Sequence, residues 1–166
     1  GQRIGAEAIC GLSVTSTLGT VCLVDGRGEA LGPALMYNDR RAVREAAEVN
    51  RAGAELAAKL GYRFSASFAL PKLLWLQRRD SERFRAACYF LSPTDFIIGR
   101  LTGCFDVSDY SNALKVDYDL IEGRWPDFIE AELGIPCAKL PRIVPPGTQI
   151  GAITPSAAEE TGLAEG

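Results

Sequence analysis

The sequence predicts an α/β domain, because short, β-rich apolar segments alternate with amphipathic helical patterns along its 166 residues. This length fits one domain with its own hydrophobic core. The hydrophobic content of 47% and the charged content of 23% are close to those of ordinary globular proteins. The sequence has no internal repeat and no low-complexity tract, so we expect a single folded unit.

The first elements are predicted to be strands. Residues 8–14 and 19–24 are apolar and β-rich, and the polar turn 15–18 joins them as a β-hairpin. A glycine-rich turn at 25–28 and a third short strand at 33–37 follow.

A long charged helix is predicted next, beginning at Asn38 or Asp39 as its cap and ending near Leu60, where Gly61 stops it. Its charged face is formed by side chains spaced three and four residues apart, which are Arg44, Glu48, Arg51, Glu55 and Lys59.

A second helix is predicted over residues 67–79, where leucines recur on one face. Proline is well placed in the first turn of a helix, so Pro93 and Pro155 are expected to open two more. The other predicted elements are a short helix at 81–87, a strand at 89–91, a helix end at Gly103, a helix at 125–133 closed by Gly134, an extended connection at 135–147, a strand at 150–154 and a helix end at Gly162.

Charge and residue usage exclude several classes of function. The net charge of −3 gives no basic surface for nucleic acid or an anionic membrane, and no apolar run reaches the ~20 residues of a membrane span. Residues 1–8 show no signal-peptide pattern. The five cysteines are odd in number and widely spaced, which favours free thiols in a reducing cytoplasm. Without histidine, neither a zinc site nor a Ser-His nucleophile is expected, and we predict no metal site from side chains alone.

Five segments carry the functional interpretation. They are the turn Thr15-Ser16-Thr17-Leu18-Gly19-Thr20, the run Tyr37-Asn38-Asp39-Arg40-Arg41, the stretch Pro71-Lys72-Leu73-Leu74-Trp75-Leu76, the segment from Asp95 to Gly103, and Asp109-Tyr110-Ser111-Asn112-Ala113. In this order and spacing they resemble the sugar-binding domain of the FGGY carbohydrate kinases, and within that family the ribulose and xylulose kinases. The resemblance implies part of a ribonuclease H-like fold, as in actin and the sugar kinases, with residues 3–14 matching an interior strand.

The resemblance implies that the turn at 15–20 reaches the sugar hydroxyls. Thr15 stands where related kinases have an acidic residue and Leu18 where they have serine, which makes Thr17 and the amides near Gly19 the candidate contacts. Taken alone, the same turn is typical of an ordinary polar hairpin.

Tyr37 and Asp39 resemble the W-x-D-x-R segment of the family, with tyrosine in place of tryptophan. An aromatic ring can cover the C–H face of a polyol, and a carboxylate can accept hydrogen bonds from its hydroxyls. The alternative is structural, with Asp39 capping a helix and Tyr37 in the core.

Lys72 is a further candidate for substrate binding, either by contact with the sugar or by orienting the loop over it. Trp75 and Leu73 on the same helix are expected to serve packing. Asp109 and Asn112 are candidates for the cleft lining, while Ser111 is expected to be structural.

The resemblance covers residues 1–166 as part of the N-terminal domain of such a kinase. It places the phosphate-loop strand, the aspartate that acts as general base and the nucleotide lobe outside this chain, so no catalytic residue is assigned here.

The implied function is transfer of phosphate from ATP, with Mg²⁺, to a primary hydroxyl of D-ribulose or D-xylulose. ATP and Mg²⁺ would bind mainly to the lobe outside these residues, and a homodimer is a possible assembly. We expect the chain alone to be inactive. The alternatives are a sugar-sensing or interaction domain without catalysis and an actin-like scaffold piece.

Overall fold

The computed structural model describes residues 5–166, so the first two residues of the segment 3–14 lie outside the described part. Short strands and helices alternate along the chain, which confirms the predicted α/β class. The helices are α1 (Val43–Ala52), α2 (Ala54–Leu60), α3 (Ala69–Arg79), α4 (Ser81–Ala86), α5 (Pro93–Thr102), α6 (Tyr110–Ala113), α7 (Phe128–Ala131) and α8 (Pro155–Thr161). The strands are β1 (Cys22–Val24), β2 (Tyr89–Leu91), β3 (Val107–Asp109) and β4 (Arg142–Val144), and the 3₁₀ turns are η1 (Ala6–Ala8), η2 (Leu114–Val116) and η3 (Cys137–Lys139).

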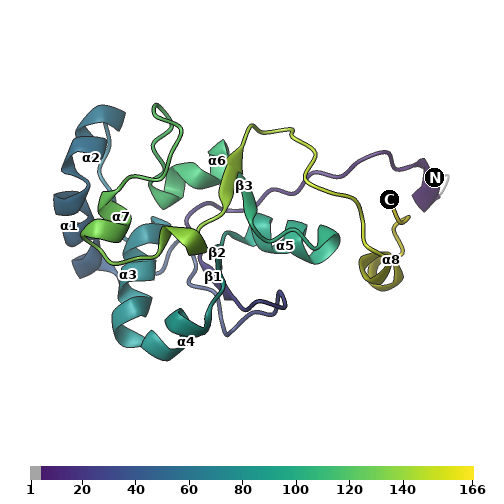
Figure 1. Ribbon diagram of the computed structural model, residues 1–166, viewed down its shortest axis with the longest axis horizontal. Coiled ribbons are helices and arrows are strands. Elements are labelled where there is room, and N and C mark those ends of the chain that lie inside the picture. Colours follow the sequence, from purple (N-terminus) through teal and green to yellow (C-terminus); the bar gives the residue numbers. More distant parts are fainter. Residues whose placement is uncertain (1–4) are drawn as a thin grey trace.

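Helix α3 is the centre of the core. It packs against α1 and α4, and its leucine face is almost completely buried, with Leu70, Leu73, Leu74 and Leu76 each at most 1% exposed. Burying one such side chain contributes about 1.5–3 kcal/mol, so this face accounts for a large part of the apolar stabilisation. In Figure 1 the helices α1 to α4 gather at one end of the molecule, while α8 and the N-terminal segment lie at the other.

The strands pair differently from the predicted hairpin. β1 pairs antiparallel with β2, with Leu23 opposite Phe90, and β3 pairs parallel with β4, with Ser108 opposite Ile143. The expected third strand, residues 33–37, contributes only a single bridge from Leu35 to Val21.

The predicted strand at residues 8–14 is not formed. This segment follows η1 as irregular chain, and its Ile9 and Leu12 side chains are 43% and 52% exposed. A strand needs a partner for its amides and carbonyls, and within residues 5–166 no segment pairs with this one. The predicted strand at 150–154 is likewise irregular.

The long charged helix is divided in two at Gly53. A β-carbon at this position would lie 2.7 Å from Cζ of Phe128 and 2.8 Å from Cε2 of Phe64, so the two rings pack against its backbone. The helix also begins later than predicted, at Val43, and no side chain caps it. Gly61 ends α2 in the left-handed conformation, as the sequence predicts.

Helices with strong local signals are confirmed. Ser92 and Asp95 form a capping box at the start of α5, and Gly103 ends it with φ of 79°. Thr154 caps α8. Helix α7 is shorter than the predicted 125–133 helix, and the connection at 135–147 contains η3 and β4. None of the helices in the described part is both long and apolar enough to cross a membrane.

Candidate functional site

Lys72 stands in the first turn of α3 and is 0% exposed. Its Nζ donates hydrogen bonds to the carbonyl oxygens of Gly19 at 3.0 Å, Ala66 at 2.7 Å and Phe68 at 3.1 Å. An ammonium group has three N–H donors, so all three are engaged by backbone carbonyls. The side chain therefore ties the loop before β1 to the N-terminal end of α3.

Burial lowers the pKa of Lys72 to about 8. The carboxylate of Asp39 opposes this shift because it attracts the ammonium, and the ammonium of Lys115 adds to it. These two side chains come from the segment before α1 and from η2. The structure thus brings Gly19, Asp39 and Lys72, three of the predicted site residues, into one neighbourhood.

The backbone of Gly19 lies directly against the segment that precedes α3. Its φ is 81°, and a β-carbon here would lie 2.0 Å from the carbonyl oxygen of Ser67. A larger residue would therefore push the loop away from α3, besides adopting an unfavourable backbone conformation. The other end of the loop is held by Ser16, whose Oγ lies 2.7 Å from Oγ1 of Thr94.

Tyr37 and Asp39 lie beside this loop. The Tyr37 amide donates to Oγ1 of Thr20 at 3.0 Å, and the Tyr37 side chain is 43% exposed, so it is not a core residue. Asp39 does not cap α1. Its Oδ1 accepts from the amide and Nε of Arg41 at 3.0 and 2.9 Å, and its Oδ2 lies 2.8 Å from Arg41 Nη2.

The carboxyl of Asp39 is held in its ionised form. Burial alone would raise its pKa, but the hydrogen bonds and charge of Arg41, with the charge of Lys72, lower it. The guanidinium of Arg41 also lies 5.0 Å from the ring centre of Trp75. Asp39 is therefore an oriented acceptor at the edge of the loop.

Lys115 and Phe68 belong to the same group, although the sequence did not identify them as site residues. The Lys115 ammonium lies 3.9 Å from the ring centre of Phe68, and this ring packs against Tyr62 and Phe64. We call Gly19, Tyr37, Asp39, Phe68, Lys72 and Lys115 the Lys72 cluster. No local pattern predicts the Lys115 contact, because it depends on η2 folding over the start of α3.

The other predicted site residues lie in different settings. Thr17 is exposed on the loop between Ser16 and Gly19. Asp109 Oδ1 accepts from the amides of Ser111 at 2.7 Å and Asn112 at 3.0 Å, so it caps α6. Asn112 is buried in that helix. Within residues 5–166 neither of these two side chains is hydrogen-bonded to the Lys72 cluster.

A cavity of about 490 Å³ lies apart from the Lys72 cluster. It is a cleft between the N-terminal segment, α5, β3 and residues 144–153, and its lining includes Leu12, Ile98, Leu101, Asp95 and Asp109. Asp95 is buried, one of its carboxyl oxygens has no hydrogen-bond partner in the described part of the chain, and burial raises its pKa. The cleft combines apolar walls with the buried carboxyl group of Asp95 and the partly buried carboxyl group of Asp109.

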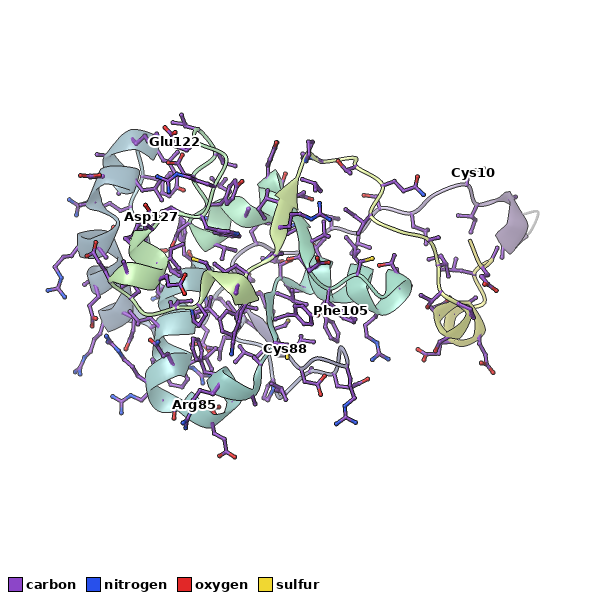
Figure 2. The ribbon with its side chains drawn as sticks, viewed as in Figure 1. Cys10, Arg85, Cys88, Phe105, Glu122 and Asp127 are labelled. Atoms are coloured by element: carbon purple, nitrogen blue, oxygen red, sulfur yellow. The ribbon has the colours of Figure 1, made fainter. Side chains whose placement is uncertain are left out.

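The cysteines are free and dispersed. Figure 2 shows Cys10 on the extended N-terminal segment and Cys88 in the main body of the molecule. Burial, with the nearby charge of Asp95, raises the pKa of Cys22 to about 11, which leaves its thiol protonated. Among residues 5–166 no three histidine, cysteine, aspartate or glutamate side chains are grouped to hold a metal ion.

The family model for the N-terminal domain of the FGGY family of carbohydrate kinases matches residues 2–166. The chain belongs to the FGGY family. It is 27% identical to the xylulose kinase of Bacillus subtilis in a match that covers 99% of this chain and 33% of that protein. It is 28% identical to the autoinducer-2 kinase of Klebsiella pneumoniae, over 99% of this chain and 31% of that protein.

Solved structures confirm the partial ribonuclease H-like fold of this FGGY chain. The xylulose kinase from Rhodospirillum rubrum matches with a TM-score of 0.82 and 31% identity, over 92% of this chain and 32% of that one. The structure described as a xylulose kinase from Brucella ovis matches with a TM-score of 0.78 and 29% identity, over 89% of this chain and 31% of that one. The chain spans about a third of the length of its relatives.

Proposed function

We propose that these residues are the sugar-binding part of an ATP-dependent kinase that phosphorylates D-xylulose or D-ribulose at a primary hydroxyl. The observation that carries the proposal is the convergence on Lys72 of the loop at 15–20, the Tyr37–Asp39 segment and the start of α3, in a chain of the FGGY family. Three of the four relatives and solved structures named above are described as xylulose kinases, which supports a ketopentose as the substrate.

In the proposed site Asp39 accepts hydrogen bonds from sugar hydroxyls, and the Tyr37 ring covers a C–H face of the sugar. Asp39 is suited to this role because Arg41 fixes its orientation and keeps it ionised. Thr17 and the loop amides near Gly19 supply further polar contacts. Asp109 and Asn112 are retained as proposed cleft-lining residues: Asp109 lines the cleft of about 490 Å³ while it caps α6, and Asn112 is buried in α6.

The residues present do not fit ATP or Mg²⁺. No group of three acidic or other ligating side chains is found within the described ranges, and no glycine-rich loop opens a helix at the Lys72 cluster. We therefore assign ATP, Mg²⁺ and the general base to the rest of the parent chain, and this domain contributes the positioning of the sugar. We propose that the cleft of about 490 Å³ between the two ends of the chain contacts the nucleotide lobe of the parent protein. Cytoplasmic location and a homodimer stay predictions.

The test is a coupled ATP assay on the full-length protein with D-xylulose, D-ribulose, glycerol and D-gluconate. We expect the highest kcat/KM for one of the two ketopentoses, and no sugar-dependent ATP turnover by the 166-residue chain alone. Turnover by the isolated chain would contradict the assignment of the catalytic groups to the rest of the parent. Sugar binding without turnover by the full-length protein would identify a sugar-sensing domain instead.

A further inference from the structure

The loop that faces the proposed sugar site is fixed at two points. Ser16 is bonded to Thr94 at the start of α5, and the Gly19 carbonyl is bonded to Lys72 on α3. Thr17 and Leu18 are the residues between these anchors, so their placement depends on both. Lys72 makes more hydrogen bonds than the Ser16 anchor, because its ammonium also donates to the carbonyls of Ala66 and Phe68.

We propose that Lys72 is a positioning residue that holds the 15–20 loop against the start of α3, and that loss of its proton loosens this loop and weakens sugar binding. This inference rests on the proposed function, since it assigns a means of pH control to the same site. It adds a role that does not require Lys72 to touch the sugar, because its three donors are already engaged.

The proton count gives the mechanism. A protonated Lys72 supplies one N–H to each of the three carbonyls, whereas a neutral amine has two N–H groups and a lone pair. One carbonyl would then lose its donor and face the lone pair, in a place that is closed to water. Loss of the bond to the Gly19 carbonyl is the change that would free the loop. The other two carbonyls, of Ala66 and Phe68, belong to the turn that leads into α3.

The pH range follows from the surroundings of Lys72. Burial lowers its pKa to about 8, with Asp39 and Lys115 as the charged groups that face it from the segment before α1 and from η2. Arg41 is paired with Asp39 and keeps that carboxylate ionised throughout this range. Deprotonation of Lys72 is therefore expected above about pH 8.

The experiment measures KM for D-xylulose and KM for ATP with the full-length kinase between pH 6.5 and 9.5. We expect the sugar KM to rise at least fivefold through about pH 8 while the ATP KM changes less than twofold, because ATP is bound elsewhere. Lys72→Met should have a raised sugar KM at every pH and lose the pH dependence. Lys72→Arg, which stays charged, should also lose the pH dependence and regain part of the affinity.

Lys59→Met is the matched control, because Lys59, on α2, is paired with Asp119 and Glu122, which lie after η2 and outside the 15–20 loop. It should keep the wild-type sugar KM and its pH dependence. If Lys72→Met fails to fold, the wild-type profile and Gly19→Ala decide, because the added β-carbon displaces the loop from Ser67 and leaves Lys72 in place. A flat wild-type profile, or an unchanged sugar KM in Lys72→Met or Gly19→Ala, overturns the inference.

The proposed function and this inference fail in different ways. If the parent phosphorylates none of the sugars, calorimetric titration with D-xylulose across the same pH range replaces KM. Binding that weakens above about pH 8 and in Lys72→Met would then support the positioning role without the kinase activity. Absence of both turnover and binding overturns both proposals.

Discussion

Asp117 and Asp119 are two residues apart, yet their carboxyl groups occupy opposite environments. Asp117 is 0% exposed, neither of its carboxyl oxygens has a hydrogen-bond partner among residues 5–166, and its backbone is left-handed with φ of 67°. Asp119 accepts from the amides of Ile121 and Glu122, each at 2.9 Å, and from Lys59 at 2.8 Å. Burial raises the pKa of Asp117 well above its ordinary value. For Asp119 burial acts in the same direction, but the Lys59 and amide bonds outweigh it and lower the pKa.

Asp117→Asn is expected to stabilise the protein, increasingly as pH rises. The folded state holds the Asp117 proton more tightly than the unfolded state, so wild-type stability falls above the ordinary aspartate pKa of about 3.9, by up to about 1.4 kcal/mol per pH unit. Asparagine cannot ionise and tolerates the left-handed backbone. Thermal unfolding of the full-length variant and wild type at pH 5 and pH 8 should show the larger gain in Tm at pH 8.

Asp119→Asn is the control of opposite sign. Its carboxylate is favoured in the folded state, so its stabilising effect is present above about pH 3.9 and is lost as pH falls through the lowered pKa. The variant should therefore be less stable than wild type at pH 7, by about 1 kcal/mol, and the difference should vanish towards pH 3. Parallel Tm profiles for both variants would contradict the assignment of a neutral Asp117.

Asp39→Asn is expected to raise the sugar KM at least tenfold, equivalent to about 1.4 kcal/mol, because the amide is a weaker acceptor for sugar hydroxyls and loses its charge-assisted bonds to Arg41. Asp25→Asn is the matched control. Asp25 accepts from two turn amides and faces Arg27, but it lies outside the Lys72 cluster. An unchanged sugar KM in Asp39→Asn would assign Asp39 to structure alone.

Leu18→Ser tests which sugar the loop selects. Leu18 is half-buried between the two anchors of the loop. It stands where related kinases have serine, so the proposed pocket has one hydroxyl group fewer to bond the sugar. A hydroxyl left without a partner costs about 1–3 kcal/mol, so serine should change the ratio of kcat/KM for D-ribulose and D-xylulose at least fivefold. Leu120→Ser, an exposed leucine in a distant loop, should leave the ratio unchanged. Equal ratios in Leu18→Ser and wild type would place Leu18 outside the pocket.

Gly99→Ala tests the packing beneath α5. The new β-carbon would lie 2.2 Å from Cδ1 of Phe105, so overpacking of about 1–3 kcal/mol should outweigh the helical preference of alanine, about 1 kcal/mol. In a Phe105→Ala background the clash is absent, and the same substitution should become stabilising. Denaturant unfolding of the four proteins gives the coupling energy. A coupling near zero would mean that the Phe105 ring moves away without cost.

The elements with complete local signals were predictable from the sequence. Both ends of α5 are marked within residues 92–103, by Pro93, the Ser92–Asp95 capping box and Gly103, and these signals need no distant contact. The predicted hairpin of residues 8–14 and 19–24 was wrong, because β1 instead pairs with β2, which is far away along the chain. Strand β2, Tyr89–Leu91, is entirely apolar and was predicted. Strands β3 and β4 were missed because each mixes polar and apolar residues and has only three residues, too few to show an alternating pattern.

The candidate site was predictable only in part, because its motifs are local in the sequence but its contacts join distant segments. The motif containing Lys72 was visible, but its role depends on the Gly19 carbonyl, 53 residues away. The sequence therefore identified Lys72 as a candidate without showing that its ammonium is fully occupied. The position of Lys115 over Phe68 also requires tertiary structure, because it arises from the packing of η2 on α3.

The break between α1 and α2 has a consequence for how this domain can vary. Gly53 touches the rings of Phe64 and Phe128, which come from the loop before α3 and from α7. A side chain at position 53 would meet both rings, so it can be accommodated only if one ring becomes smaller and the other shifts or also becomes smaller. In a library of folded variants randomised at the three positions, we therefore expect substitutions at 53 to occur together with smaller residues at 64 or 128. The three positions should vary together rather than independently.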